Sequence, residues 1–147
     1  MRPQPPQVLM GMAGVLMLKL APELQTPFAQ QNIGSVAGIL TMLAQEYDRA
    51  AARFAEENDA MVALFRRASR AMPTGPVRSK MLQEIAANPN ADLHVSKLQG
   101  ENDRLRRMLV EVQALVEALP GEEAAGINEE IWDELRESTR RRHIMFG

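Results

Sequence analysis

Apolar residues recur at alternating spacings of three and four across residues 27–72. This heptad spacing places one face of a helix against a partner helix. It predicts one long helix, with Thr26 as its N-cap and Pro27 at its first helical position. Two prolines and a glycine within residues 72–76 end it. The positions are Ile33, Val36, Leu40, Leu43, Tyr47, Ala50, Phe54, Met61, Leu64 and Ala68.

A second heptad pattern covers residues 92–119, where a large aliphatic residue recurs every seven positions from Leu98. Shorter helices are predicted over residues 7–20 and 77–87, and from Asn128 as N-cap to residues 140–143. Residues 1–6 are expected to be a disordered lead, and residues 122–126 an acidic loop. No alternation typical of a strand is found. We therefore expect an all-α helical bundle of about five helices, forming a single domain over residues 7–147.

The length of the first heptad helix raises a question of assembly. At 1.5 Å per residue it would be about 69 Å long. A compact chain of this size has a radius of gyration of about 15 Å. The helix therefore either kinks, near Gly34 and Gly38 or near Glu57 and Asn58, or protrudes and packs on a second subunit.

Glu57 interrupts the heptad pattern where an apolar residue is expected. A buried carboxylate is costly unless it is paired. One interpretation is a buried ion pair with Arg104, Arg106 or Arg107 of the second heptad helix. The other is that the long helix has left the core by residue 57, which leaves Glu57 in solvent.

Charge is unevenly distributed along the chain. Residues 1–45 carry three charged residues, Arg2, Lys19 and Glu23. The first third is therefore expected to be buried on several sides, either inside the bundle or in a subunit interface. Its apolar runs, residues 8–18 and 33–44, are shorter than the ~20 residues that span a bilayer. We expect no membrane span and a cytoplasmic protein.

Composition excludes several classes of chemistry. The chain has no Cys and two His, so disulfides, thiol catalysis and Cys- or multi-His metal sites are not expected. A net charge of −2 argues against a nucleic-acid binder. His94, two residues after Asp92, is interpreted as a solvated residue in the first turn of a helix. We expect no cofactor, no metal and no catalytic residue.

Some residues are candidates for contact with a partner. Gly34 and Gly38 would let another helix approach closely. Met42 and the other methionines of the charge-poor third fill a core or line an adaptable binding surface. Arg140, Arg141 and Arg142 form the sharpest basic cluster, which either contacts phosphate or pairs with acidic neighbours at a helix end.

Four segments carry a resemblance to known proteins. They are LAPEL at residues 20–24, EYDRAA at 46–51, ENDRLR at 101–106 and IWDELR at 131–136. Together with the apolar, glycine-containing opening helix, they resemble small all-helical bacterial proteins of unknown function. Some of those proteins are encoded beside acyl-CoA dehydrogenases and aminoglycoside-phosphotransferase-like kinases. The resemblance implies an accessory role near such an enzyme, and it carries over no catalytic motif.

Three hypotheses of function follow from the sequence. The first is a non-enzymatic helical interaction protein, an accessory subunit or adaptor that self-associates as a homo-oligomer. Its self-association candidates are Gly34, Gly38, Met42, Glu57, Arg140, Arg141 and Arg142. The second is a helical bundle that binds an apolar or acyl ligand. The third is an enzyme that uses Glu and Arg residues.

Overall fold

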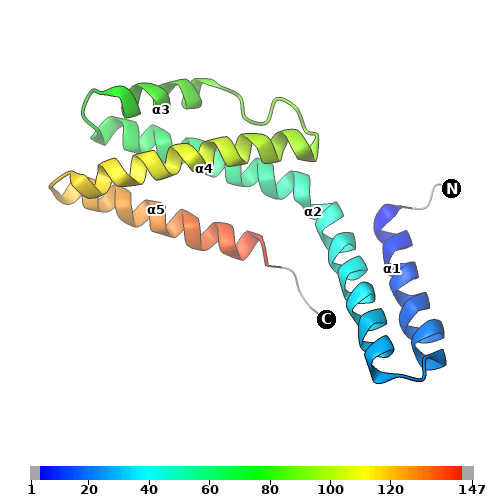
Figure 1. The fold of residues 1–147 in the computed structure, drawn as a ribbon. Coiled ribbons are helices and arrows are strands. Elements are labelled where there is room, and N and C mark those ends of the chain that lie inside the picture. Colours follow the sequence, from blue (N-terminus) through cyan, green and yellow to red (C-terminus); the bar gives the residue numbers. More distant parts are fainter. Residues whose placement is uncertain (1–3, 144–147) are drawn as a thin grey trace. The chain divides into compact units, whose positions relative to one another are not determined.

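The computed structural model describes residues 4–143, which are helical almost throughout (Figure 1). Five α-helices occur in this range, with no strand, so the all-α prediction is confirmed. A π-helical turn, Leu16–Leu20, and a 3₁₀ turn, Ala21–Glu23, lie between the first two helices. The α-helices are α1 (Pro5–Val15), α2 (Pro27–Ala71), α3 (Pro76–Ala86), α4 (Val95–Ala118) and α5 (Glu122–Arg141).

The described chain groups into two compact units. Residues 4–50 hold α1 and the first part of α2, which form a helical hairpin (Figure 1). Residues 51–143 hold the remainder of α2 with α3, α4 and α5. The sequence predicts one domain over residues 7–147, whereas the structure gives two clusters of contacts joined by one helix. Within residues 4–143, no helix combines the length and apolarity needed to cross a membrane.

Helix α2 is continuous over 45 residues and confirms the predicted long helix. It starts as the sequence predicts, because the Thr26 hydroxyl accepts a hydrogen bond of 3.3 Å from the backbone N–H of Ala29. Gly34, Gly38 and Glu57 all lie inside the helix, and none of them ends it. The helix ends at Ala71, one residue earlier than predicted.

The core of residues 51–143 is built from the heptad positions of α2 and α4, closed by α3 and α5. Burial of these side chains supplies most of the stability of the unit, at about 25 cal/mol per Å² of apolar surface. The fully buried members include Phe65 of α2, Met81 of α3, Leu105 of α4 and Ile131 of α5.

Hydrogen bonds from two asparagine side chains connect the loop between α3 and α4 to α2. The Asn90 side-chain amide donates to the backbone carbonyl of Ala55 at 3.2 Å and to Asp59 Oδ1 at 3.0 Å. Its oxygen accepts from Asn58 Nδ2 at 3.2 Å. Asn58 is fully buried and also donates to the carbonyl of Leu98 in α4. These bonds hold the start of α4 against α2.

Several predicted boundaries are wrong. α1 begins at Pro5, so residues 5 and 6 are helical; residues 1–3 of the predicted lead lie outside the described residues. α4 begins at Val95, because Asp92 accepts hydrogen bonds from His94 and forms a turn ahead of the helix.

The largest correction concerns α5. It begins at Glu122, so the predicted acidic loop is its first turn and Asn128 is an interior residue. Gly121 has a φ of 109° and makes the sharp entry to the helix. Glu122 and Glu123 then stand in the first turn, where the helix dipole favours negative charge.

Candidate functional site

The hairpin of residues 4–50 leaves most of its large apolar side chains exposed. Its buried residues are four alanines: Ala13, Ala37, Ala44 and Ala50. Burial of the first third inside the bundle is therefore wrong for these residues, while burial in a subunit interface stays a prediction. Its exposed large apolar residues number twelve: Val8, Met10, Met12, Val15, Met17, Leu18, Leu20, Phe28, Val36, Ile39, Leu43 and Tyr47.

Gly34 and Gly38 do not meet another helix of the same chain closely. A Cβ built on either glycine would find no atom within 4 Å. Met42 is half-buried, and Met10, Met12 and Met17 are exposed, so these methionines do not fill a closed core. Contact of these residues with a second copy stays a prediction.

Glu57 lies in a buried ion-pair cluster, so its predicted solvation is wrong and its predicted burial is confirmed. Its side chain is 0% exposed. Arg142 of the α5 end binds both carboxylate oxygens, with Nε–Oε1 at 3.0 Å and Nη2–Oε2 at 2.7 Å. Arg106 of α4 donates to Oε2 at 3.1 Å, as does Asn102. Arg53, one helical turn earlier, lies 3.7 Å from Oε1.

These contacts decide the charge state of Glu57. Burial by itself raises the pKa of the carboxyl group. Hydrogen bonds from Arg142 and Arg106, with the attraction of their positive charges, outweigh that effect and lower the pKa from 4.5 to about 2. Glu57 is therefore ionised at neutral pH and is held by positive charge from α2, α4 and α5.

The cluster is also closed by polar groups around the arginines. Arg106 donates to Asn102 Oδ1 at 2.9 Å and to Ser138 Oγ at 2.5 Å. Asn102 is fully buried and donates to Asn58 Oδ1 at 3.0 Å. Here the donors and acceptors of buried polar side chains bind one another, which is typical of a hydrogen-bond network with a structural role. The Glu57 cluster, defined as Glu57, Arg53, Asn102, Arg106 and Arg142, therefore ties three helices together.

The prediction that one of three arginines of α4 pairs with Glu57 is confirmed at Arg106. Of the other two, Arg104 pairs with Glu84 and Glu101, and the Arg107 side chain is exposed. Arg142 was predicted as part of a basic cluster, without its role as the bidentate partner of Glu57. The sequence carries no signal for that contact, because 85 residues separate the two.

The basic cluster at the end of α5 divides among acidic partners. Arg140 pairs with Glu137 at 3.2 Å, and Arg141 pairs with Glu134 at 2.7 Å. The hydrogen bond to Glu134 raises the pKa of Arg141. With Arg142 on Glu57, all three arginines pair with acidic residues of the chain. The structure therefore supports the ion-pair interpretation over phosphate contact.

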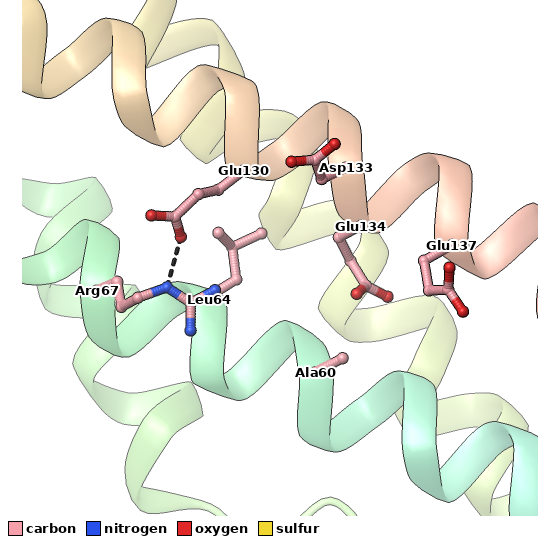
Figure 2. Close-up of a pocket in the computed structure, with 7 residues that line it drawn as sticks. All are labelled: Ala60, Leu64, Arg67, Glu130, Asp133, Glu134 and Glu137. Carbon is pink, nitrogen blue, oxygen red and sulfur yellow. Dashed lines mark hydrogen bonds and ion pairs between the residues drawn. The ribbon is translucent and has the colours of Figure 1, made fainter.

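An open groove of about 380 Å³ lies between α2 and α5, with acidic side chains along its α5 wall (Figure 2). Arg67 of α2 and Glu130 of α5 meet across it in an ion pair (Figure 2). Each carboxylate of this wall has an arginine partner, which reduces the attraction the groove offers to a cation. The pairs are Glu130–Arg67, Asp133–Arg136, Glu134–Arg141 and Glu137–Arg140.

His94 and Asp92 form a contact that the sequence did not predict. Both residues precede α4, and His94 Nδ1 lies 2.5 Å from Asp92 Oδ1. Hydrogen bonds from the backbone and ring of His94 lower the pKa of Asp92. The His94 side chain is 83% exposed, as its interpretation as a solvated residue requires. No group of three His, Asp or Glu residues placed to hold a metal ion occurs in the part of the chain that the structure describes.

No protein-family model, curated protein or solved structure matches this chain. The resemblance to small all-helical bacterial proteins stays a prediction.

Proposed function

We propose that this chain is a non-enzymatic helical interaction protein, an accessory subunit or adaptor of the cytoplasm that self-associates through residues 4–50. The observation that carries the proposal is the hairpin itself, which buries four alanines and exposes twelve large apolar residues. Exposed apolar surface of this extent is typical of protein interaction sites.

The other unit supports the same proposal by contrast. In residues 51–143 most large apolar side chains form one core, and five are exposed: Leu82, Leu93, Val95, Val110 and Trp132. The charged residues of the Glu57 cluster pair within that cluster, and the carboxylates of the acidic groove pair with arginines. A paired, hydrogen-bonded arginine or carboxylate is poorly placed to act on a substrate. This unit is therefore suited to act as a stable scaffold, and the hairpin to act as the association element.

Sedimentation equilibrium of the full chain over ~1–100 μM tests the proposal. Because the hairpin cannot bury its apolar side chains alone, we expect a mass of at least twice the 16.4 kDa of one chain. A mass of 16.4 kDa throughout that range would contradict the proposal.

Native mass spectrometry of the same sample separates self-association from the alternative function. Binding of an apolar or acyl ligand would appear as a single chain with added small-molecule mass. That result, with no dimer in solution, would replace the proposal by the ligand-binding hypothesis.

A further inference from the structure

The first part of α2 carries two neighbouring apolar stripes. The inner stripe includes Ala37 and Ala44, which are buried, together with half-buried Ile33 and Leu40. The outer stripe, which we call the α2 stripe, consists of residues at spacings of three and four that are about half exposed. Its members are Val36 (49% exposed), Ile39 (54%), Leu43 (51%) and Tyr47 (60%).

Three members of the α2 stripe, Val36, Leu43 and Tyr47, are in heptad register with the buried face of the same helix. Seven-residue steps lead from Leu43 to Ala50, Glu57 and Leu64, all of which are buried. The same steps lead from Tyr47 to Phe54, Met61 and Ala68, which are also buried. One heptad pattern thus continues through α2, with buried positions from Ala50 onward, whereas Val36, Leu43 and Tyr47 of the same pattern are about half exposed.

Resting on the self-association proposed above, we infer that the α2 stripe of one copy packs against the α2 stripe of a second copy in a symmetric dimer. A twofold interface uses the same surface on both partners, and a heptad stripe is complementary to itself through knobs-into-holes packing. A stable interface engages about 20–30 residues on each side. The hairpin of residues 4–50 is large enough to supply that number.

Charge favours a protein copy over a lipid surface. Helices that lie on membranes carry many Lys and Arg residues on their polar face. Residues 4–50 have three acidic and two basic side chains, and the α2 stripe itself carries no charge. The centres of protein interfaces are depleted of charge in the same way. The charged residues of this unit are Lys19, Glu23, Glu46, Asp48 and Arg49.

A charge placed in the stripe tests the interface in the full-length chain. Leu43→Glu puts two like charges into the dimer contact, and we expect the dissociation constant to rise at least about 100-fold. Gln31→Glu adds the same charge about 120° around the helix from Leu43, and we expect it to leave the mass unchanged. Gln31 and Leu43 are both exposed in the single chain, so circular dichroism should show unchanged helix in both variants.

The absence of cysteine allows a second, independent measurement. Single-cysteine variants Ile39→Cys and Leu43→Cys, treated with a short bismaleimide, should give a covalent dimer on a denaturing gel. Gln31→Cys should react with a monofunctional maleimide but give little dimer. Equal crosslinking at all three positions would overturn the inferred interface.

The outcomes separate this inference from the proposed function. If the wild type is a dimer and Leu43→Glu keeps the dimer mass, the α2 stripe is not the interface, while self-association stands. If the wild type is a monomer at every concentration, both the inferred α2 interface and the proposed self-association are contradicted. If the wild type is a monomer and floats with phosphatidylcholine–phosphatidylglycerol vesicles while Leu43→Glu does not, the stripe binds lipid and the dimer is excluded.

Discussion

Glu57 is the residue at which the sequence pattern and the chemistry conflict most. It occupies a heptad position of α2 where every neighbour of the pattern is apolar, and it is fully buried. Burying a carboxylate costs several kcal/mol, which close pairing can offset. Arg142 and Arg106 provide that pairing from two other helices. The charge therefore acts as a specific connection between α2, α4 and α5.

Removing the carboxylate should destabilise the protein. We expect Glu57→Ala to lower the free energy of unfolding by about 3 kcal/mol, because it removes the carboxylate that pairs with Arg142 and Arg106 and leaves a cavity in its place. Glu57→Leu should cost less, since Leu fills the space and both arginine side chains, 42% and 30% exposed, can turn to water. Urea unfolding beside the exposed control Glu129→Ala, expected within about 0.5 kcal/mol of wild type, measures both. Two values close to that of the control would contradict a stabilising role for the pair.

The lowered pKa of Glu57 predicts how stability depends on pH. A carboxyl with a folded-state pKa of about 2 and an ordinary value of 4.5 stabilises the fold fully above pH 4.5. That contribution, roughly 3 kcal/mol, is lost as the pH falls through 2. Relative to Glu57→Gln, the wild type should therefore lose its advantage between pH 4.5 and 2. Urea unfolding of both proteins at pH 7, 4 and 2.5 measures this, and a constant difference would refute it.

At the scale of elements, the sequence predicts α2 and α4 well because their heptad patterns are long. Because the apolar spacing repeats many times, one polar residue at a heptad position, such as Glu57, does not change the prediction of a helix. The start of α5 is harder, because Asn128 is a typical N-cap residue and the acidic, small residues before it are typical of a loop. The geometry of Gly121, with its positive φ, decides the start in favour of residue 122.

The Glu57 cluster shows the limit of pattern reasoning for a site. Arg106 could be proposed because it lies on the second heptad helix, whose pairing with α2 is implied by the two patterns. Arg142 lies at the end of α5, and no periodicity relates that end to residue 57. The sequence also could not decide whether the first third lies in the core or on the surface. A helix with few charged residues is expected both in a core and in an interface.

Asn128 tests the corrected start of α5. As an N-cap, its replacement by Ala would cost about 1 kcal/mol. In the structure it is an interior residue, and its side-chain oxygen is buried with no hydrogen-bond partner among the described residues. Because Ala is the better helix former, we expect Asn128→Ala to raise the free energy of unfolding by about 0.5 kcal/mol. A thermal melt that shows a clear loss of stability would restore the N-cap interpretation.

At the scale of the whole molecule, the two units differ in how they satisfy their apolar residues. Residues 51–143 bury large side chains from four helices around one core. Residues 4–50 contain only two long helical segments. The face between two helices is too small to bury the large apolar side chains that both of them carry. The unit with the fewest charges is thus also the one with the most exposed apolar side chains, which is why we assign association to it.

Gly34 and Gly38 distinguish the inferred interface from contact through small residues. They lie about 180° and 140° around the helix from Leu43, away from the α2 stripe, and a Cβ on either meets no atom within 4 Å. The double variant Gly34→Ala/Gly38→Ala should therefore keep the dimer mass and gain helix stability of about 1 kcal/mol per site. Sedimentation equilibrium and urea unfolding check the two parts. Dissociation to 16.4 kDa would place the glycines in the interface.

The continuity of α2 across both units has a consequence for the order of folding. The nucleation of a helix is unfavourable, but once a first turn has formed the helix extends residue by residue. The core of residues 51–143 can nucleate α2, so its first part should grow outward from Ala50 toward Pro27. Amide hydrogen exchange should accordingly quicken from Phe65 toward Pro27 in dilute protein. It should slow over residues 36–47 as concentration rises, and an even rate along α2 at every concentration would contradict this order.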